Sequence, residues 1–213
     1  MTDFPSGMHF VKICGITSVH DAVVVREAGA SAIGVNFTTS TRRVGAPLAH
    51  EIVASSPGLI HVGIFRDDES SYVLAMTDAS GIDVVQIHGT LDGTLLEELR
   101  GRNVGVIKAL SVGTEEFFSF DETNVDAVHL DGLEPGSGRE HSWEALTNRS
   151  FAVPVIAAGG LNADSVASVI ELVKPWGVDV ATGVESSPGV KDPDRVTRFV
   201  QMAMSALERE GAA

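Results

Sequence analysis

The sequence predicts an α/β fold and, within that class, a single (β/α)8 barrel. Short apolar runs rich in β-branched residues alternate with segments of helical periodicity along the chain of 213 residues. Eight such strand–helix repeats follow one another, and no long linker or low-complexity segment divides them. Chemically active side chains also fall at the ends of the strands, where barrels place their ligands. A doubly wound sheet is the alternative, because counting repeats does not show that the sheet closes.

The strands are expected where β-branched and aromatic residues form runs bounded by turn residues. The first run breaks at Gly15, and Thr17 and Ser18 follow as possible helix caps, with Asp21 placed for a capping box. Glycine, proline and asparagine mark the other boundaries. The expected strands are Phe10–Cys14, Ala32–Phe37, Leu59–Phe65, Val84–Ile87, Val104–Ala109, Val125–Leu130, Val153–Ala157 and Gly177–Val180.

A helix is expected after each strand. Asp192-Pro193 starts the last one, because an N-cap aspartate precedes a proline at the first helical position. Residues 1–8 and 209–213 are expected to be flexible tails of one domain that spans 1–213. The expected helices are Val19–Ala28, one from Pro47 that ends before Pro57, Ser70–Ala79, Leu91–Arg100, a short one at Glu115–Phe118, Ser142–Leu146, one capped by Asn162, and one from Asp192 to Glu208.

Composition limits the class of protein. Apolar residues make up 44% of the chain, but no apolar run is long enough to span a bilayer. No basic segment precedes an apolar one at the N-terminus, so no signal peptide is expected. The single cysteine excludes an internal disulfide and fits the reducing cytoplasm. The formal charge of −14 argues against nucleic-acid and anionic-membrane partners, so local groups must capture an anionic substrate.

Glycines follow the last two expected strands. Gly159-Gly160 come after the seventh strand and Thr182-Gly183 after the eighth. Glycine lets the backbone approach a ligand closely, and backbone amides at such turns bind oxyanions. Loops after strands seven and eight are also the usual phosphate site of these barrels. Ordinary turns would explain one such pair, but two pairs on adjacent strands favour phosphate binding.

Two strand ends carry groups that can transfer protons. Cys14 ends the first strand, where it is either a reactive thiol or a small buried side chain. Asp131 ends the sixth strand and could be an acid or base, a metal ligand or a cap for the next loop. No set of His, Asp and Glu residues has the spacing of metal ligands, so no metal is expected. No cofactor is expected either.

Side-chain alternation along a strand places a second titratable residue on the same face as each of these two. Lys12 shares a face with Cys14, and His129 shares a face with Asp131. If that face is the barrel interior, both residues lie one layer below the strand ends. If the register differs by one residue, both face the helices instead. A buried His129 would need a hydrogen-bond partner, for which Lys12, Cys14 and Asp131 are the candidates.

The loop after the second strand contains two arginines. Arg42 and Arg43 follow four Thr or Ser residues. A solvated pair of charges is the default for such a loop. The alternative is that one guanidinium holds a substrate carboxylate in a two-bonded fork.

Ordered motifs run from Val11 to Val196, nearly the whole chain. They are Lys12-Ile13-Cys14-Gly15-Ile16-Thr17, Gly34 to Phe37 with Thr41-Arg42-Arg43-Val44, Val62-Gly63-Ile64-Phe65, Gln86-Ile87-His88-Gly89, Leu130-Asp131 with Gly136-Ser137-Gly138 and Trp143, Ala158-Gly159-Gly160-Leu161, Gly177-Val178-Asp179-Val180, Gly183-Val184-Glu185 and Ser187-Pro188-Gly189. Together they resemble the phosphoribosylanthranilate isomerases, a family of barrel enzymes in the tryptophan branch of aromatic amino acid biosynthesis. So many matches in order are far more specific than any single glycine motif.

The resemblance implies an Amadori rearrangement, in which N-(5-phosphoribosyl)anthranilate becomes 1-(2-carboxyphenylamino)-1-deoxyribulose 5-phosphate by general acid–base catalysis. By position, Asp131 would be the acid on the ring oxygen and Cys14 the base at C2. Arg43 would hold the anthranilate carboxylate. Cys14 must act as a thiolate, which Lys12 would favour and the substrate phosphate would oppose. The resemblance also assigns substrate contacts to Gln86, His88 and Asp179, and phosphate contacts to Gly159, Gly160, Thr182 and Gly183.

Some positions depart from the family pattern. Ala181-Thr182 stands where two serines are usual, although Thr182 keeps one hydroxyl. Pro135 replaces the first glycine of a loop, which removes one amide donor. His141-Ser142 precedes Trp143 where Phe-Asp or Phe-Asn is common, and His129 stands where the family is usually aliphatic. None of these touches the proposed acid, base or carboxylate clamp.

Other functions compete with this one. A ribulose-phosphate epimerase would need paired aspartates and metal-binding histidines, which the chain does not offer. The related isomerase of histidine biosynthesis would have an aspartate where Cys14 stands. A phosphosugar-binding protein without activity would need neither Cys14 nor Asp131. The expected partner is therefore a small phosphosugar. The chain is expected to be a monomer, with a homodimer as the alternative.

Overall fold

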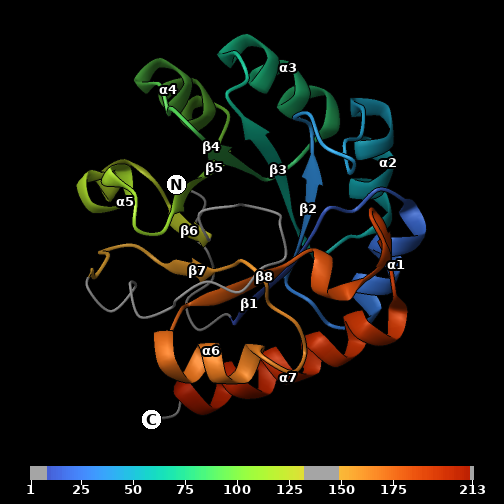
Figure 1. The fold of residues 1–213 in the computed structure, drawn as a ribbon. Helices are drawn as coiled ribbons and strands as arrows, with labels where there is room; N and C mark the ends of the chain where they lie inside the picture. Colours follow the sequence, from blue (N-terminus) through green and yellow to red (C-terminus); the bar gives the residue numbers. More distant parts are fainter. Residues whose placement is uncertain (1–8, 132–148, 212–213) are drawn as a thin grey trace.

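The computed structural model describes residues 9–131 and 149–211. At its centre eight parallel strands form a closed barrel in chain order (Figure 1). The closing pair is β1 with β8, in which Lys12 is in register with Asp179. This confirms the barrel and excludes the doubly wound sheet. The strands are β1 (Phe10–Cys14), β2 (Ala32–Asn36), β3 (Ile60–Arg66), β4 (Val84–His88), β5 (Gly105–Ser111), β6 (Ala127–Asp131), β7 (Val155–Ala157) and β8 (Gly177–Val180).

Helices surround the barrel and cover the outer face of its strands (Figure 1). The expected cap of the first helix is confirmed, because Ser18 Oγ accepts a hydrogen bond from the Asp21 amide at 3.1 Å. The helices are α1 (Val19–Glu27), α2 (Ala46–Ser55), α3 (Ser70–Ser80), α4 (Gly93–Gly101), α5 (Glu115–Ser119), α6 (Val166–Val173) and α7 (Pro193–Gly211), with short 3-10 turns η1 (Glu122–Asn124) and η3 (Thr182–Val184).

Several expected boundaries are wrong, each for a local reason. The seventh strand begins at Val155, directly after Pro154, which has no amide hydrogen to donate to a ladder. Asn162 does not cap α6. Its side chain instead accepts hydrogen bonds from the amides of Asp164 and Ser165, and this turn delays the helix. The last helix continues past Glu208 to Gly211.

The sequence analysis missed a small hairpin after β8. The strands β9 (Glu185–Ser187) and β10 (Val190–Lys191) pair in antiparallel fashion. Gly189 lies in the tight turn between them with φ 81°, a conformation that favours glycine. The hairpin places Glu185 and Lys191 beside the end of β8, and both side chains are buried.

Some expectations lie outside the described residues. They are the loop of Pro135 and Gly136-Ser137-Gly138, the helix Ser142–Leu146 with Trp143, and the tail at residues 1–8. Within the part of the chain that is described, no helix is both long and apolar enough to cross a membrane.

The barrel interior changes character along its axis. At the amino ends of the strands the interior is filled by apolar side chains, one from each of seven strands. There Phe10 stacks on Trp176 with ring centroids 4.7 Å apart. One layer higher several inward side chains are polar, among them Lys12, His129 and Asp179, all buried. The apolar layer is Phe10, Ala32, Val62, Val84, Ile107, Ala127 and Ile156. Burying charges requires partners, so the polar layer marks the end of the barrel where chemistry is expected.

Candidate active site

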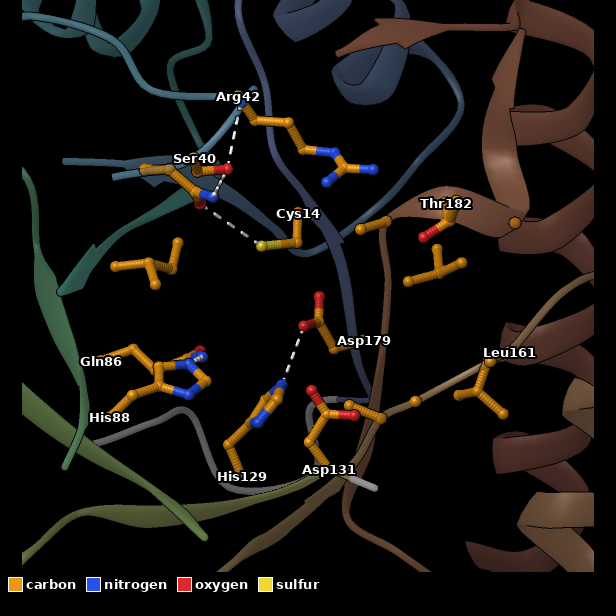
Figure 2. A pocket seen from close by; sticks show the side chains of 18 of the residues that line it. Cys14, Ser40, Arg42, Gln86, His88, His129, Asp131, Leu161, Asp179 and Thr182 are labelled. Carbon is orange, nitrogen blue, oxygen red and sulfur yellow. Dashed lines mark hydrogen bonds and ion pairs between the residues drawn. The ribbon is translucent and has the colours of Figure 1, made fainter. Parts of the chain in front are cut away.

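A cavity of about 460 Å³ opens at the carboxyl ends of the strands. Figure 2 shows side chains from β1, β4, β6 and β8 pointing into this one space. Of the residues that the sequence assigns to catalysis, substrate binding or phosphate binding, all but Arg43 line this cavity. They are Cys14, Gln86, His88, Asp131, Gly159, Gly160, Asp179, Thr182 and Gly183. The expectation that active groups cluster at the strand ends is therefore confirmed.

Cys14 lies at the end of β1 with its thiol directed across the cavity. Its Sγ is 4.0 Å from Asn36 Oδ1, an acceptor for the thiol proton. A Cβ at Gly34 would come within 2.9 Å of that sulfur, so the glycine leaves room for the thiol. Burial raises the pKa of the Cys14 thiol, and the Lys12 ammonium opposes this only in part. Lys12 therefore acts in the expected direction, but it does not outweigh burial.

His129 and Asp131 both point inward from β6, as strand alternation predicted. The alternative register, with both facing the helices, is excluded. The expected partners of His129 are wrong, however. Its Nε2 lies 2.9 Å from Asp179 Oδ2 on β8, and Asp179 was not among the three candidates. The residues meet because β6 and β8 flank β7, and inward side chains from alternate strands of a barrel share an interior layer.

Lys12, Asp179 and His129 form a buried network beneath the cavity. Asp179 Oδ2 is 2.9 Å from Lys12 Nζ as well as from His129 Nε2. Burial alone would raise the pKa of Asp179, but Lys12 and His129 lower it to about 2. Burial alone would lower the pKa of Lys12, but Asp179 and Cys14 raise it. The network therefore holds an ammonium and a carboxylate, and the Lys12 ammonium also acts on Cys14.

Gln86 and His88 form the wall on β4. The Nε2 atoms of the two side chains are 2.9 Å apart. The pKa of His88 lies well below its ordinary value because of burial, the neighbouring His129 and nearby cations. His88 is therefore a neutral imidazole near pH 7, and it can accept or donate one hydrogen bond to a ligand.

The two glycine loops meet at the rim of the cavity. Gly159 and Gly160 have φ angles of 98° and 69°, which favour glycine. A Cβ at Gly183 would lie 2.1 Å from the Leu161 carbonyl oxygen, so the loop after β8 packs directly on the loop after β7. The structure thus brings together the four residues selected for phosphate binding.

The two arginines lie in different places. Arg42 lines the cavity, and its Nε and Nη2 donate to the two carboxylate oxygens of Glu185, both at 2.7 Å. Arg43 does not line the cavity. It is exposed, and its Nη2 donates to the Tyr72 hydroxyl at 3.1 Å. The expected carboxylate clamp is therefore not preformed in this structure.

Sequence reasoning missed Glu185 and Lys191 as residues that shape the site. Lys191 Nζ lies 2.9 Å from Glu185 Oε1, so Glu185 carries two cationic partners. Burial alone would raise the pKa of Glu185, but Arg42 and Lys191 lower it. The only local signal is the Gly-Val-Glu motif, since Arg42 and Glu185 are 143 positions apart. This buried cluster joins the loop after β2 to the hairpin after β8.

The geometry supports proton transfer on an anionic ligand. A thiol on β1 and a carboxyl group on β6 face one cavity, a requirement for acid and base steps on one molecule. Glycine loops at one side offer backbone amides to a phosphate. Arginines lie on the loop after β2, where they can counter further negative charge.

Comparisons with known proteins agree with this geometry. Residues 11–202 match the family described as N-(5'phosphoribosyl)anthranilate (PRA) isomerase. The isomerase of Geotalea uraniireducens is 41% identical over 203 residues, which cover 91% of this chain and 97% of the relative. That of Methanopyrus kandleri is 38% identical, covering 92% and 98%.

Solved structures give the same result. A structure of the Thermotoga maritima phosphoribosyl anthranilate isomerase has a TM-score of 0.84 and 32% identity, covering 93% of this chain and 100% of that one. Another isomerase was solved with reduced 1-(o-carboxyphenylamino)-1-deoxyribulose 5-phosphate, with a TM-score of 0.78 and 30% identity, covering 93% and 100%. A thiamine phosphate pyrophosphorylase from Pyrococcus furiosus, at 19% identity and a TM-score of 0.70, shares the fold alone.

Proposed function

The chain belongs to the N-(5'-phosphoribosyl)anthranilate isomerase family, and on this premise we propose how its own residues perform the reaction. Its activity is the isomerisation of phosphoribosylanthranilate in tryptophan biosynthesis, and its substrate is a small phosphosugar. The observation that supports the residue assignment is the placement of Cys14 and Asp131 on opposite walls of one cavity, beside two glycine loops.

Asp131 is the general acid. It gives a proton to the ring oxygen of the ribose while the C1–O bond breaks and the nitrogen lone pair forms a C=N bond. The β6 strand holds Asp131 at the cavity with only 8% of its surface exposed, so few water molecules compete for that proton.

Cys14 is the general base. Its thiolate takes the proton from C2, the C–H electron pair forms the C1=C2 bond, and the C=N electrons return to nitrogen. The resulting enol becomes the 1-amino-1-deoxyketose when C1 gains a proton and the hydroxyl on C2 loses one. Because burial raises the pKa of Cys14, the base must first lose its proton, and Lys12 is the cation that assists this loss.

The phosphate binds at the loops of Gly159-Gly160 and Thr182-Gly183. Both loops line the cavity and pack on each other. Backbone amides beside positive-φ glycines are suited to oxyanions. Gln86, His88 and Asp179 contact the rest of the substrate, since their polar atoms face the same space.

Arg43 holds the anthranilate carboxylate after it turns inward from the rim. Arg42 is less available to bind the substrate carboxylate, because its guanidinium already donates hydrogen bonds to both carboxylate oxygens of Glu185. The Arg43 guanidinium has only the Tyr72 hydroxyl as a described hydrogen-bond partner, and it lies on an exposed surface, so little is lost when it rotates toward a ligand.

We propose a single domain over residues 1–213, because β1 and β8 close one barrel. We further propose a cytoplasmic monomer, although a Thermotoga maritima relative is described as dimeric. Sedimentation of the purified chain at micromolar concentration separates monomer from homodimer.

The test of function is turnover of phosphoribosylanthranilate by the purified chain and by Cys14→Ser and Asp131→Asn. We expect the unsubstituted chain to form the ketose and both variants to bind substrate without converting it. A phosphosugar-binding protein would bind the substrate with no turnover in any of the three.

A further inference from the structure

His129 is buried in the interior of the site, and the acid and base steps leave it without a role. Only 2% of its surface is exposed. Its Nε2 lies 2.9 Å from Asp179 Oδ2 (Figure 2). The low pKa of Asp179, about 2, keeps that carboxylate ionised, and an ionised carboxylate can only accept. The Nε2 atom of His129 therefore carries the proton in this bond.

The same carboxylate oxygen also has Lys12 as a partner. Lys12 Nζ lies 2.9 Å from Asp179 Oδ2, and the ammonium also interacts with Cys14. Asp179 thus has one hydrogen-bond donor, His129, and one cationic partner, Lys12, whose charge is divided between Asp179 and Cys14. A carboxylate that loses its hydrogen-bond donor holds its remaining cation more strongly.

We propose that His129 is a positioning residue: by donating its Nε2–H to Asp179 it satisfies part of that carboxylate's charge, so that the Lys12 ammonium stays available to Cys14. The inference rests on the proposed role of Cys14 as the base. His129 touches neither the thiol nor the reacting atoms, and it acts through Asp179 and then Lys12.

Other groups also set the charge around Cys14, and the test must separate them from His129. Among the described residues they are Lys12 on the same strand, Asp179 on β8, Lys191 on β10, Arg42 after β2 and Asp131 on the cavity wall. His88 also faces the cavity, but it is neutral near pH 7. Only His129 bonds to Asp179 from β6, so a change at this one position tests the proposed link.

The experiment measures the rate of alkylation of Cys14 by iodoacetamide between pH 6 and 10. Cys14 is the only cysteine in the chain, so the rate reports this thiolate alone. His129→Gln places an amide N–H near the position of Nε2, whereas His129→Asn places its amide near Nδ1. The two variants carry the same functional group and differ in whether it reaches Asp179. His88→Leu is the matched control for loss of a buried cavity histidine.

We expect Cys14 in His129→Asn to be alkylated at least about threefold more slowly at pH 7.5 than in the unsubstituted protein. The alkylation curve of the variant should lie about half a pH unit or more higher. His129→Gln and His88→Leu should react like the unsubstituted protein. Equal rates in His129→Asn and the unsubstituted protein would overturn the proposal. So would a slow His129→Gln, since packing rather than the bond would then explain the change, or a His88→Leu as slow as His129→Asn.

Alkylation does not depend on turnover, so the two proposals fail separately. If Cys14→Ser retains isomerase activity, Cys14 is not the base and the proposed mechanism is wrong, whatever the alkylation rates show. If Cys14→Ser is inactive and the rates of all His129 variants are equal, only the role of His129 is wrong.

Discussion

Two histidine–aspartate pairs occupy opposite ends of the barrel, and they differ in what surrounds them. At the amino end His61 Nδ1 lies 2.8 Å from Asp83 Oδ2, and His61 Nε2 lies 3.1 Å from Ser56 Oγ. At the carboxyl end His129 Nε2 lies 2.9 Å from Asp179 Oδ2. In the first pair both ring nitrogens have partners. In the second, His129 Nδ1 and Asp179 Oδ1 are buried without hydrogen-bond partners among the described residues.

The serine, histidine and aspartate at the amino end have the order of a nucleophilic triad, but they cannot act as one. Ser56 is fully buried, and its hydroxyl donates to the Ile52 carbonyl at 2.7 Å. No substrate can reach that oxygen. The cluster at the carboxyl end faces a cavity of about 460 Å³ instead. Residue types alone therefore do not distinguish structural polar clusters from functional ones, whereas access and unsatisfied polar atoms do.

The largest expected effect is at the carboxyl end. Cys14→Ser and Asp131→Asn should each lower kcat by about 10²–10⁴-fold, the usual contribution of a placed acid or base. The unfolding temperature should change little, since both substitutions are close in volume to the original side chain. Turnover and thermal unfolding measured on the same samples check this. A loss below about tenfold would remove the role assignment.

The amino-end pair should show the opposite behaviour. His61→Leu removes the contacts that the imidazole makes with Ser56 Oγ and with the Asp83 carboxylate, in a site where His61 is only 6% exposed. Unfolding free energy should fall by about 1–3 kcal/mol, with kcat unchanged. Urea unfolding together with turnover makes the comparison. A kcat that falls with stability intact would show that the two ends are not independent.

The clamp prediction distinguishes the two arginines at the carboxyl end. Arg43→Ala should raise KM roughly tenfold or more, because a charge-assisted bond to the substrate carboxylate is lost. Arg42→Ala should raise KM less and lower stability, because Lys191 is then the one cationic partner left to Glu185 among the described residues. Equal KM values in the two variants would mean that neither arginine binds the substrate carboxylate directly and that the loop contributes only a general positive charge.

Acid denaturation should involve the amino-end pair. The hydrogen bonds from His61 lower the pKa of Asp83 although burial alone would raise it. A carboxyl group with a depressed pKa in the folded state adds stability above its unfolded pKa, near 4, and loses it as the pH falls through the folded value. Asp83→Asn should therefore flatten the loss of stability below pH 4, as followed by urea unfolding at several pH values. An unaltered acid slope would contradict this.

The smallest effect concerns the phosphate loops. Gly183→Ala would place a Cβ 2.1 Å from the Leu161 carbonyl oxygen, so one loop must shift. Competitive inhibition by inorganic phosphate should weaken by about threefold, a change of about 0.6 kcal/mol. Gly101→Ala is the control, because a Cβ at Gly101 would meet no other atom within 4 Å. Equal inhibition constants in the two variants would place the phosphate elsewhere.

Much of the site was predictable because its signals are local. Cys14 follows an apolar run and precedes a glycine, and the glycines at 159, 160 and 183 follow strands directly. Alternation along β6 placed His129 and Asp131 on one face. Each of these inferences needs only a few neighbouring residues and the period of a strand.

The remaining contacts are set by how the barrel closes. His129 and Asp179 are 50 positions apart, and Arg42 and Glu185 are 143 apart. No local pattern indicates which carboxylate meets which donor across β7 or between two loops. The sequence also could not show that Arg42 rather than Arg43 lines the cavity, because neighbouring residues in a loop do not follow the alternation of a strand.

The central claim is that the Cys14 thiolate takes the proton from the substrate, and the pH dependence of kcat/KM tests it most directly. The account predicts that activity rises with pH along the same curve as iodoacetamide alkylation of Cys14, with a midpoint above the ordinary value for a thiol because burial raises the pKa of Cys14. Activity that is already maximal at a pH where alkylation shows Cys14 to be almost wholly protonated would contradict the account.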